Sequence, residues 1–299
     1  MIDATRDAFI SANTGSMAKI DLILPEIIET LARTAERGGS HIHPQGVTTG
    51  FKDVDHLTGG IWPGDLMCVT GPPGVGKTAF ALNAAVNAAK EGVVVLFFGL
   101  ETSMGATVLR IISSEGRLPL SKLRRGLVMS DDWDQICNAT NSLKDLNLHI
   151  CDDPLIGPET VRAIADQICG QTERTLVVLD GVNASETNWC AALKETASVL
   201  GVPVLMTVPF LRECSDDERA SITEGRFAHD ALLGLIGEPA RTADSVILLT
   251  GQGVEDDSYR SKALVADVIV VKNRGGQAGE LQLVFLKESM RFIDYAREA

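Results

Sequence analysis

One stretch, from Asp65 to Ser103, constrains the fold of this chain more than any other. Its first apolar run is followed by Gly71-Pro-Pro-Gly-Val-Gly-Lys-Thr78, which fits the phosphate-loop pattern G-x-x-x-x-G-K-T in full, and Ala79–Lys90 continues as an Ala-rich helix. A strand, a glycine-rich turn and a helix, in that order, form the context that confirms such a motif. The sequence therefore predicts a site for a nucleoside triphosphate.

The residue types in this loop suit the binding of phosphate. Glycines let backbone N–H groups converge on the phosphates, and the helix N-terminus adds its positive end. Lys77 would reach the β- and γ-phosphates of ATP, and the Thr78 hydroxyl would bind Mg²⁺. We expect the following residues to contact the nucleotide: Gly71, Pro72, Pro73, Gly74, Val75, Gly76, Lys77, Thr78 and Ala79.

Two carboxylates follow other apolar runs. Thr175–Asp180 is a strand pattern that ends in an acid, and Asp180 would help to hold Mg²⁺ and nucleotide at the carboxyl end of the sheet. The alternative is an acid that simply ends a strand. Glu101 follows Val93–Phe98 and could accept a proton from, or orient, the water that attacks the γ-phosphate. Its alternative role is that of a helix cap or first-turn acid.

A later apolar run, Val268–Val271, leads into Lys272, Asn273 and Arg274 and then two glycines. Cations in such a position could stabilise the charge that develops on a transferring phosphoryl group. From the spacing alone, the charged rim of a β-hairpin is the better interpretation.

The bulk composition fits a globular cytoplasmic protein. The 299 residues, 45% hydrophobic and 22% charged, can form one large α/β core. No apolar run approaches the roughly 18 residues of a membrane helix, and no export signal is expected at the start. Six scattered cysteines without a C-x-x-C pair suit buried thiols in a reducing cytoplasm. The net charge of −13 would repel phosphate backbones unless basic groups gather locally.

Strand and helix patterns alternate along most of the chain, which favours an α/β fold with a largely parallel sheet covered on both faces. Short links between the last strand patterns predict an antiparallel extension. The expected strands are Leu66–Thr70, Val93–Phe98, Leu148–Cys151, Thr175–Leu179, Pro203–Val208, Val246–Thr250, Val268–Val271 and Leu281–Leu286. The expected helices are Thr78–Lys90, Met104–Ser114, Asp132–Lys144, Glu159–Cys169 and Trp189–Leu200.

The N-terminal segment is expected to be a loose tail over residues 1–18, followed by a short amphipathic helix, Pro25–Arg37. Pro25 would lie near its first turn, and Ile27, Ile28 and Leu31 would share one face. Such a helix must pack on its own core or on a neighbouring subunit. His41 and His43 read as part of a linker, because a metal site needs more ligands than two.

Several motifs occur in a specific order: Thr-Gly-Phe-x-x-x-Asp-x-Leu-Thr-Gly-Gly, the phosphate loop continued as Ala-Phe-Ala-Leu-Asn, Leu-Glu-x-Ser-Met, Ser-Ser-Glu-Gly-Arg and Lys-x-Arg-x-Gly. Together they resemble the DnaB-type replicative helicases, which belong to the RecA-like P-loop ATPases. The resemblance implies a RecA-like ATPase domain over residues 47–299, after a tail and linker helix over residues 1–46. No counterpart to the family's N-terminal primase-interacting domain is expected.

The resemblance also implies an assembly, a six-membered ring with ATP bound between subunits. By this likeness Lys77, Thr78 and Asp180 bind Mg-ATP, and Glu101 is the catalytic carboxylate. Lys272 and Arg274 match the family's trans-acting lysine and arginine finger, which reach a neighbour's γ-phosphate; this reverses the interpretation from spacing. The segment 25–39 looks like the linker helix that packs against the next subunit.

The segments that match the family's DNA-contacting parts depart from its pattern. Pro209 replaces a Gln that is thought to sense the nucleotide state and couple it to DNA. Leu232–Gly237 carries apolar side chains where the family has an Arg that touches the DNA backbone. Residues 181–189 lack the usual basic loop, and residues 212–229 mix acidic and basic side chains.

Two main functions follow: an ATP-driven motor that translocates on single-stranded DNA and unwinds it, or a related ATPase that acts on or scaffolds a protein partner. A paralogue with weak turnover, serving as a nucleotide-gated scaffold, is a third. If a protein partner is bound, Leu232, Leu233, Leu235 and Ile236 could form its contact surface; a buried helix is their alternative. No membrane association is expected.

Overall fold

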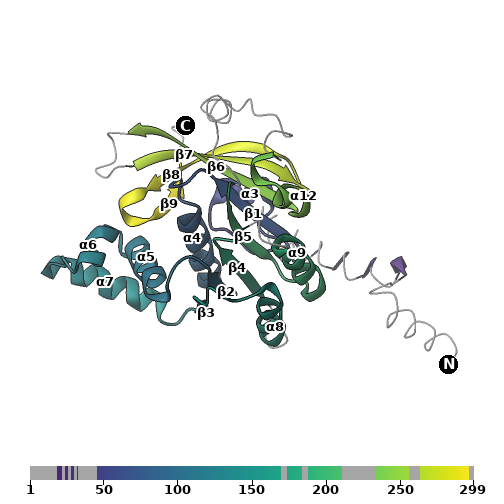
Figure 1. Ribbon diagram of the computed structural model, residues 1–299, viewed down its shortest axis with the longest axis horizontal. Coiled ribbons are helices and arrows are strands. Elements are labelled where there is room, and N and C mark those ends of the chain that lie inside the picture. The colour runs from purple at the N-terminus through teal and green to yellow at the C-terminus, as the bar shows by residue number, and fades with distance from the viewer. Residues whose placement is uncertain are drawn as a thin grey trace.

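One nine-stranded sheet, in the order β3-β2-β4-β5-β1-β6-β7-β8-β9, forms the centre of the molecule (Figure 1). The computed structural model describes residues 46–169, 174–183, 188–210, 234–255 and 263–295. Before residue 46 it describes Lys19 and seven helical residues, at positions 20, 21, 24, 25, 28, 29 and 32. The strands are β1 (Leu66–Gly71), β2 (Val94–Gly99), β3 (Leu148–Cys151), β4 (Thr175–Asp180), β5 (Val204–Pro209), β6 (Ser245–Glu255), β7 (Ala263–Asn273), β8 (Gly279–Leu286) and β9 (Arg291–Asp294).

Helices cover both faces of the sheet (Figure 1). Side chains alternate between the faces, so that Met67 and Val69 of β1 join the core that contains α4, whereas Leu66 and Cys68 join the core beneath α8, α9 and α12. The helices are α3 (Lys52–Thr58), α4 (Lys77–Lys90), α5 (Met104–Gly116), α6 (Leu120–Arg125), α7 (Ser130–Leu143), α8 (Pro158–Cys169), α9 (Trp189–Leu200) and α12 (Glu238–Thr242).

The six strands from β3 to β6 are parallel, as the alternation of strands and helices predicts. β1, β2 and β4 are buried along their whole length. Parallel strands that are covered on both faces require such continuous apolar runs. These runs are what made the strands recognisable from the sequence.

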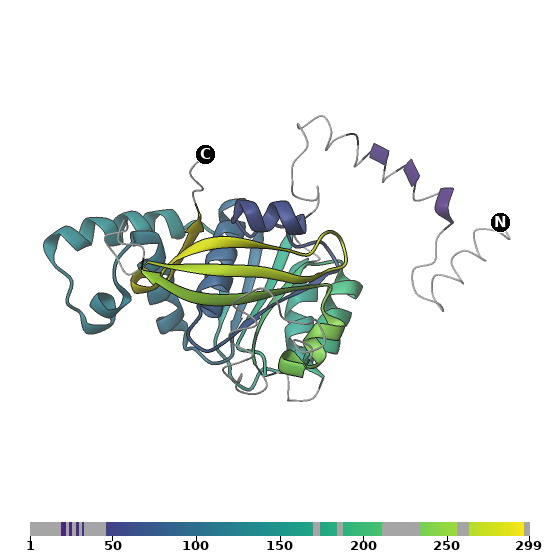
Figure 2. The ribbon, with the colours of Figure 1, turned by 90° about the horizontal axis from the view of Figure 1, so that it is seen from above.

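The remaining strands, β7, β8 and β9, extend the sheet in antiparallel fashion from β6 (Figure 2), which confirms the predicted extension. β6 and β7 have eleven residues each and run well beyond the apolar segments that signalled them. β9 was not expected, because its four residues hold only two apolar side chains between two charged ones and contain no sustained pattern.

The five predicted helices are confirmed as α4, α5, α7, α8 and α9. The short helices α3, α6 and α12 were not predicted, because five to seven residues are too few to show a helical period. No helix in the described part of the chain is long and apolar enough to cross a membrane.

The structure describes part of the segment in which the N-terminal helix was expected. Pro25 is helical, and Ile20 and Asp21, which precede the expected start, are helical as well. Ile20, Leu24 and Ile28 follow one another at a spacing of four and are all exposed, which extends the apolar stripe toward the N-terminus. The expected tail, Ile27, Leu31 and the histidine pair at 41 and 43 lie outside the described residues.

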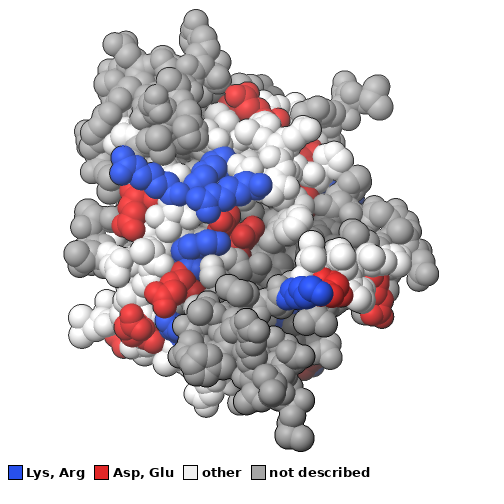
Figure 3. Space-filling view, turned by 90° about the vertical axis from the view of Figure 1, so that its right-hand side faces the viewer, with Lys and Arg blue, Asp and Glu red and all other residues white. Residues whose placement is uncertain are grey.

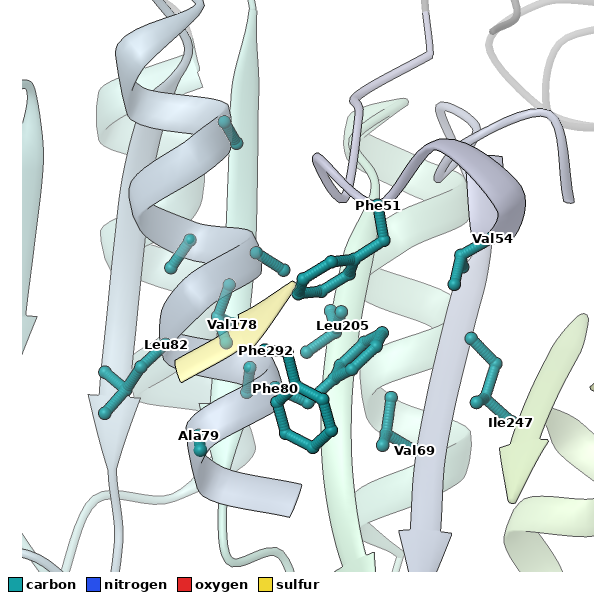
Figure 4. Close-up of a cluster of buried hydrophobic side chains, with 14 of the residues drawn as sticks. Phe51, Val54, Val69, Ala79, Phe80, Leu82, Val178, Leu205, Ile247 and Phe292 are labelled. Carbon is teal, nitrogen blue, oxygen red and sulfur yellow. The ribbon is translucent and has the colours of Figure 1, made fainter. Parts of the chain in front are cut away.

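Helix α4 is covered on nearly every side, and ten of its fourteen residues are buried. The parallel strands cover one side, and an aromatic cluster lies beside the helix (Figure 4). In this cluster, the ring of Phe292 stacks on Phe285 at 4.4 Å between centroids and meets Phe80 edge-on at 5.9 Å. Asn83 of α4 also accepts a hydrogen bond from the N–H of Phe292 at 2.7 Å. The antiparallel extension is thereby fastened to α4.

We expect Phe292→Ala to lower the free energy of unfolding by about 3–5 kcal/mol, because it empties a packed aromatic site. Val199→Ala, at a side chain that is 58% exposed, is the matched control and should change it by less than about 0.5 kcal/mol. Urea denaturation followed by circular dichroism measures both. Equal denaturation midpoints for the two variants would contradict the packing role of β9.

Candidate nucleotide-binding site

The phosphate loop joins the carboxyl end of β1 to the amino end of α4. Gly71 ends the strand, and a Cβ there would lie 2.3 Å from the carbonyl oxygen of Leu249. Gly76 caps the helix with φ of 104°, a backbone region that favours glycine. Around Gly74, apart from the glycine itself and its two neighbours in the chain, no described atom lies within 4 Å of where a Cβ would be. The loop is therefore tight where it meets β6 and open where a ligand would approach.

Lys77, the first residue of α4, folds its side chain back over the loop. Its Nζ donates hydrogen bonds to the carbonyl oxygens of Gly71 at 2.8 Å and Pro72 at 3.0 Å. Burial lowers the pKa of Lys77, while the negative charges of Asp180 and Glu101 act in the opposite direction. The amine therefore shares one electrostatic environment with both predicted carboxylates.

Asp180 ends β4 and is only 3% exposed. Its Oδ1 accepts a hydrogen bond from the Thr207 hydroxyl at 2.7 Å, and the Thr78 hydroxyl bonds to the same carboxylate. Burial raises the pKa of Asp180; the hydrogen bonds and the positive charges of Arg110 and Lys77 oppose that rise. The structure thus brings Lys77, Thr78 and Asp180 together.

Thr207 is a site residue that the sequence analysis missed. It lies on β5, the strand between β4 and β1 in the sheet. Its oxygen accepts the N–H of Gly181 at 2.9 Å, so its single hydroxyl proton is directed to Asp180. This fixes Asp180 as an acceptor and sets the orientation of its carboxylate. The only signal in the sequence is one hydroxyl residue within an apolar strand.

Glu101 lies at the same edge of the sheet, two residues beyond β2. A Cβ on Gly181 would lie 2.7 Å from the Cγ of Glu101, so the glutamate side chain packs directly over this glycine. Leu100 N–H bonds to the carbonyl oxygen of Asp180 at 3.0 Å, which ties the two strand ends together. The N-cap of α5 is Ser103, whose hydroxyl accepts the N–H of Ala106. The capping role considered for Glu101 is therefore filled by another residue.

Arg110 of α5 is a second residue that was not predicted to belong to the site. Its Nη1 donates to the Thr102 hydroxyl at 2.9 Å. Burial lowers the pKa of Arg110, and the charge of Asp180 opposes this change. Arg110 therefore places a cation near Asp180 from the side of α5. An arginine within an amphipathic helix gives no such signal in the sequence.

Lys272 and Arg274 do not join this site. In the register of the sheet, Met67 of β1 pairs with Ser245, and Ser245 pairs with Asn273, so the two cations lie at the amino edge of the parallel strands. The phosphate loop lies at the carboxyl edge. β1 spans six residues between the edges, a length on the order of 20 Å.

The donor set at the carboxyl edge suits Mg²⁺. Thr78 and Asp180 offer hard oxygen atoms, and Mg²⁺ is commonly held by one or two protein oxygens together with substrate phosphates. Among the described residues, no group of three or more His, Cys, Asp or Glu side chains could form a self-sufficient metal centre. The site therefore fits a metal ion that is bound together with a nucleotide.

Comparison with known proteins gives consistent matches. The family model of the DnaB-like helicase C-terminal domain matches residues 46–294. "Replicative DNA helicase DnaB" of Geobacillus stearothermophilus and "Replicative DNA helicase DnaC" of Bacillus subtilis (strain 168) are each 29% identical over 301 residues, covering 95% of this chain. The chain spans 64% of the length of each of these relatives.

Solved structures share the fold. A structure described as a DnaB-like replicative helicase and its interactions with primase superposes with a TM-score of 0.74 at 23% identity, over 98% of this chain and 71% of that one. A second structure, described as an ATPase domain, gives a TM-score of 0.77 at 24% identity, over 94% of this chain and 100% of that one. The predicted RecA-like ATPase fold is thereby confirmed. Because the family model matches this chain along most of the chain's length, the chain belongs to the DnaB-like helicase C-terminal domain family.

Proposed function

We propose that this chain is the ATP-hydrolysing subunit of a ring motor of the DnaB type, which translocates on single-stranded DNA and unwinds duplex DNA. The observation that carries this proposal is the placement of two half-sites on opposite edges of one sheet. Lys77 and Asp180 lie at the carboxyl edge and Arg274 at the amino edge. A subunit can therefore offer its cations only to a neighbour's nucleotide, and a closed ring gives every nucleotide such a neighbour.

ATP would be held by the nine residues of the phosphate loop named above. Backbone N–H groups and the positive end of α4 would bind the phosphates, with Lys77 reaching the β- and γ-phosphates. Thr78 and Asp180 would hold Mg²⁺. When bound, Mg²⁺ would neutralise part of the charge on the phosphate oxygens.

Hydrolysis would use residues from two subunits. Glu101 would orient the attacking water and accept its proton while the water oxygen bonds to the γ-phosphorus and the bond to the ADP oxygen breaks. Lys272 and Arg274 of the adjacent subunit would stabilise the charge on the transferring phosphoryl group. ADP and inorganic phosphate are the products.

The ring would be hexameric and held partly by the N-terminal helix. Ile20, Leu24 and Ile28 expose an apolar stripe, which supports docking of this linker on the next subunit. We accordingly divide the chain into a tail and linker helix over residues 1–46 and an ATPase domain over residues 47–299. The free cysteines of the described segments support a cytoplasmic location.

A related ATPase that acts on a protein partner is the second candidate. The net charge of −13 and the departures from the family's DNA-contacting segments favour it. The contact surface suggested for this case is wrong at Leu235 and Ile236, since both are fully buried in the core beneath α9 and α12. Leu232, Leu233 and residues 212–229 lie outside the described residues.

Thr207→Val should weaken the Mg²⁺-dependent binding of nucleotide, because it removes the hydrogen bond that orients Asp180. We expect the Mg²⁺ concentration at half-saturation to rise about 10-fold or more. A fluorescent ADP analogue titrated at varied Mg²⁺ measures this without turnover. Thr70→Val is the matched control, since Thr70 is equally buried but bonds to the carbonyl of Val208 instead. Equal Mg²⁺ midpoints for the two variants would refute the role of Thr207.

Lys77→Ala should abolish ATP hydrolysis, and Arg274→Ala should abolish it with little loss of nucleotide affinity, because Arg274 serves only the neighbour's transition state. Steady-state ATPase assays and equilibrium nucleotide binding separate the two effects. If both variants lose ATP binding equally, the assignment of Arg274 as a trans-acting residue is wrong.

Single-stranded DNA should raise the ATPase rate at low salt, and the stimulation should fall as salt rises, because phosphate contacts release counterions. The rate measured with and without DNA across a salt series tests this. A rate that is indifferent to DNA at the lowest salt favours the protein-directed ATPase. Lys77→Ala, assayed in parallel, shows any contaminating activity.

A further inference from the structure

One buried carboxylate lies directly behind Arg274. Asp244 immediately precedes β6, and its side chain is 5% exposed. Its Oδ1 accepts a hydrogen bond from Nη1 of Arg274 at 2.9 Å, and its Oδ2 accepts bonds from Nζ of Lys194 at 2.6 Å and from the N–H of Leu66 at 2.9 Å. The backbones are joined as well, because Arg274 N–H bonds to the carbonyl oxygen of Asp244 at 3.0 Å.

Further cations surround this carboxylate. Lys194 of α9 also bonds to the carbonyl oxygen of Gly64 and lies 3.7 Å from Asp65. Lys272 donates from its Nζ to the carbonyl oxygens of Ala240 and Arg241, so α12 holds it in place. Figure 3 shows the side of the molecule on which α9 and α12 lie; Lys and Arg side chains form a band there with carboxylates beneath it.

The charges in this cluster are unequal. The cluster holds two carboxylates, Asp244 and Asp65. They face three cations, Lys194, Lys272 and Arg274, so the cluster keeps a surplus of positive charge. Burial by itself raises the pKa of Asp244, but the hydrogen bonds from Leu66 N–H, Lys194 and Arg274 outweigh burial and hold the pKa below its usual value. Asp244 therefore remains ionised and can hold Arg274 over the whole working range of pH.

Arg274 keeps free hydrogen-bond donors while Asp244 holds its side chain in place. A guanidinium has five N–H donors, and the contacts with Asp244 and with the carbonyl oxygen of Arg241 use two of them. Its side chain is 53% exposed. Because Lys194 shares the same carboxylate, Asp244 does not neutralise the whole charge of Arg274. The arrangement fixes the direction of the guanidinium and leaves its outer donors for an anion.

We propose that Asp244, with Lys194 as its counter-cation, is a positioning residue that holds Arg274 ready for the γ-phosphate bound by the adjacent subunit. This inference rests on the trans-acting role proposed for Arg274. Its physical basis is pre-organisation: a side chain that is already directed contributes more to the transition state than one that must be ordered. A misplaced trans-acting group costs turnover and leaves the neighbour's ATP affinity largely unchanged.

Mixed rings test this in one assay. Arg274→Ala subunits have an intact nucleotide site but no trans-acting arginine, and Lys77→Ala subunits have the arginine but no competent nucleotide site. Mixing them should restore ATPase activity at the junctions between the two kinds of subunit. When the Lys77→Ala subunits also carry Asp244→Asn, we expect the restored kcat to fall about 10-fold or more. The KM for ATP should stay within about 2-fold of its value in the simple mixture.

The matched control replaces Asp244→Asn with Asp132→Asn in the same Lys77→Ala subunit. Asp132 is also a shielded carboxylate paired with a lysine, Lys122 at 2.7 Å, but it belongs to α7. The Asp132→Asn substitution should leave the restored ATPase rate unchanged. An effect of Asp244→Asn no larger than that of Asp132→Asn would overturn the inference, as would a rise in KM without a fall in kcat.

Lys194 gives an independent test if Asp244→Asn impairs folding. Within the described part of the chain, Lys194→Met leaves Arg274 as the only cationic side chain hydrogen-bonded to Asp244 and should lower the restored kcat, whereas Lys194→Arg should preserve it. Equal rates for these two variants would overturn the inference. If the simple mixture of Arg274→Ala and Lys77→Ala subunits restores no activity although mass measurement shows mixed rings, the proposed trans-acting role and this inference fall together. Restoration that is insensitive to Asp244 and Lys194 overturns only the inference.

Discussion

The burial of helix α4 between the parallel strands and the antiparallel extension is the constraint on which the rest of the structure depends. Its Ala-rich face approaches the sheet closely, and Phe80 and Asn83 on other faces engage β9. The same packing fixes the amino end of the helix, which is the phosphate loop, since the rings of Phe285 and Phe292 also lie against Gly76. Stability and the nucleotide site are thus consequences of one packing arrangement.

A parallel sheet has two chemically different edges, and this chain places charge on both. At the carboxyl edge the strand ends of β1, β4 and β5 bring Thr78, Asp180 and Thr207 into one hydrogen-bonded group. At the amino edge, Asp244 gathers Lys194 and Arg274. Because rigid strands separate the two groups, neither can act on the other within one subunit. An assembly that places the edges of neighbouring subunits together would turn this separation into a means of coordination.

The parts of the site that the sequence predicted are those with local signals. The phosphate loop is contiguous, and Asp180 and Glu101 each follow an apolar run that ends at the same edge of the sheet. Thr207, Arg110 and Asp244 escaped prediction because each contributes through partners that are distant in the chain. The spacing of Lys272 and Arg274 favoured a hairpin rim, and they do lie where β7 ends and its turn begins. The buried carboxylate that holds Arg274 has no counterpart in the spacing.

The sequence by itself determined the α/β class, the order of all strands before β9 along the chain and the phosphate loop, since all of these arise from short-range patterns of apolar residues and glycines. Its motif order also identified the family. Only the tertiary structure decided that Thr207 orients Asp180, that Leu235 and Ile236 are buried, and that Asp244 and Lys194 stand behind Arg274. The reason is physical: hydrogen bonds and burial depend on which strands become neighbours, and sheet order is set by packing across the whole domain.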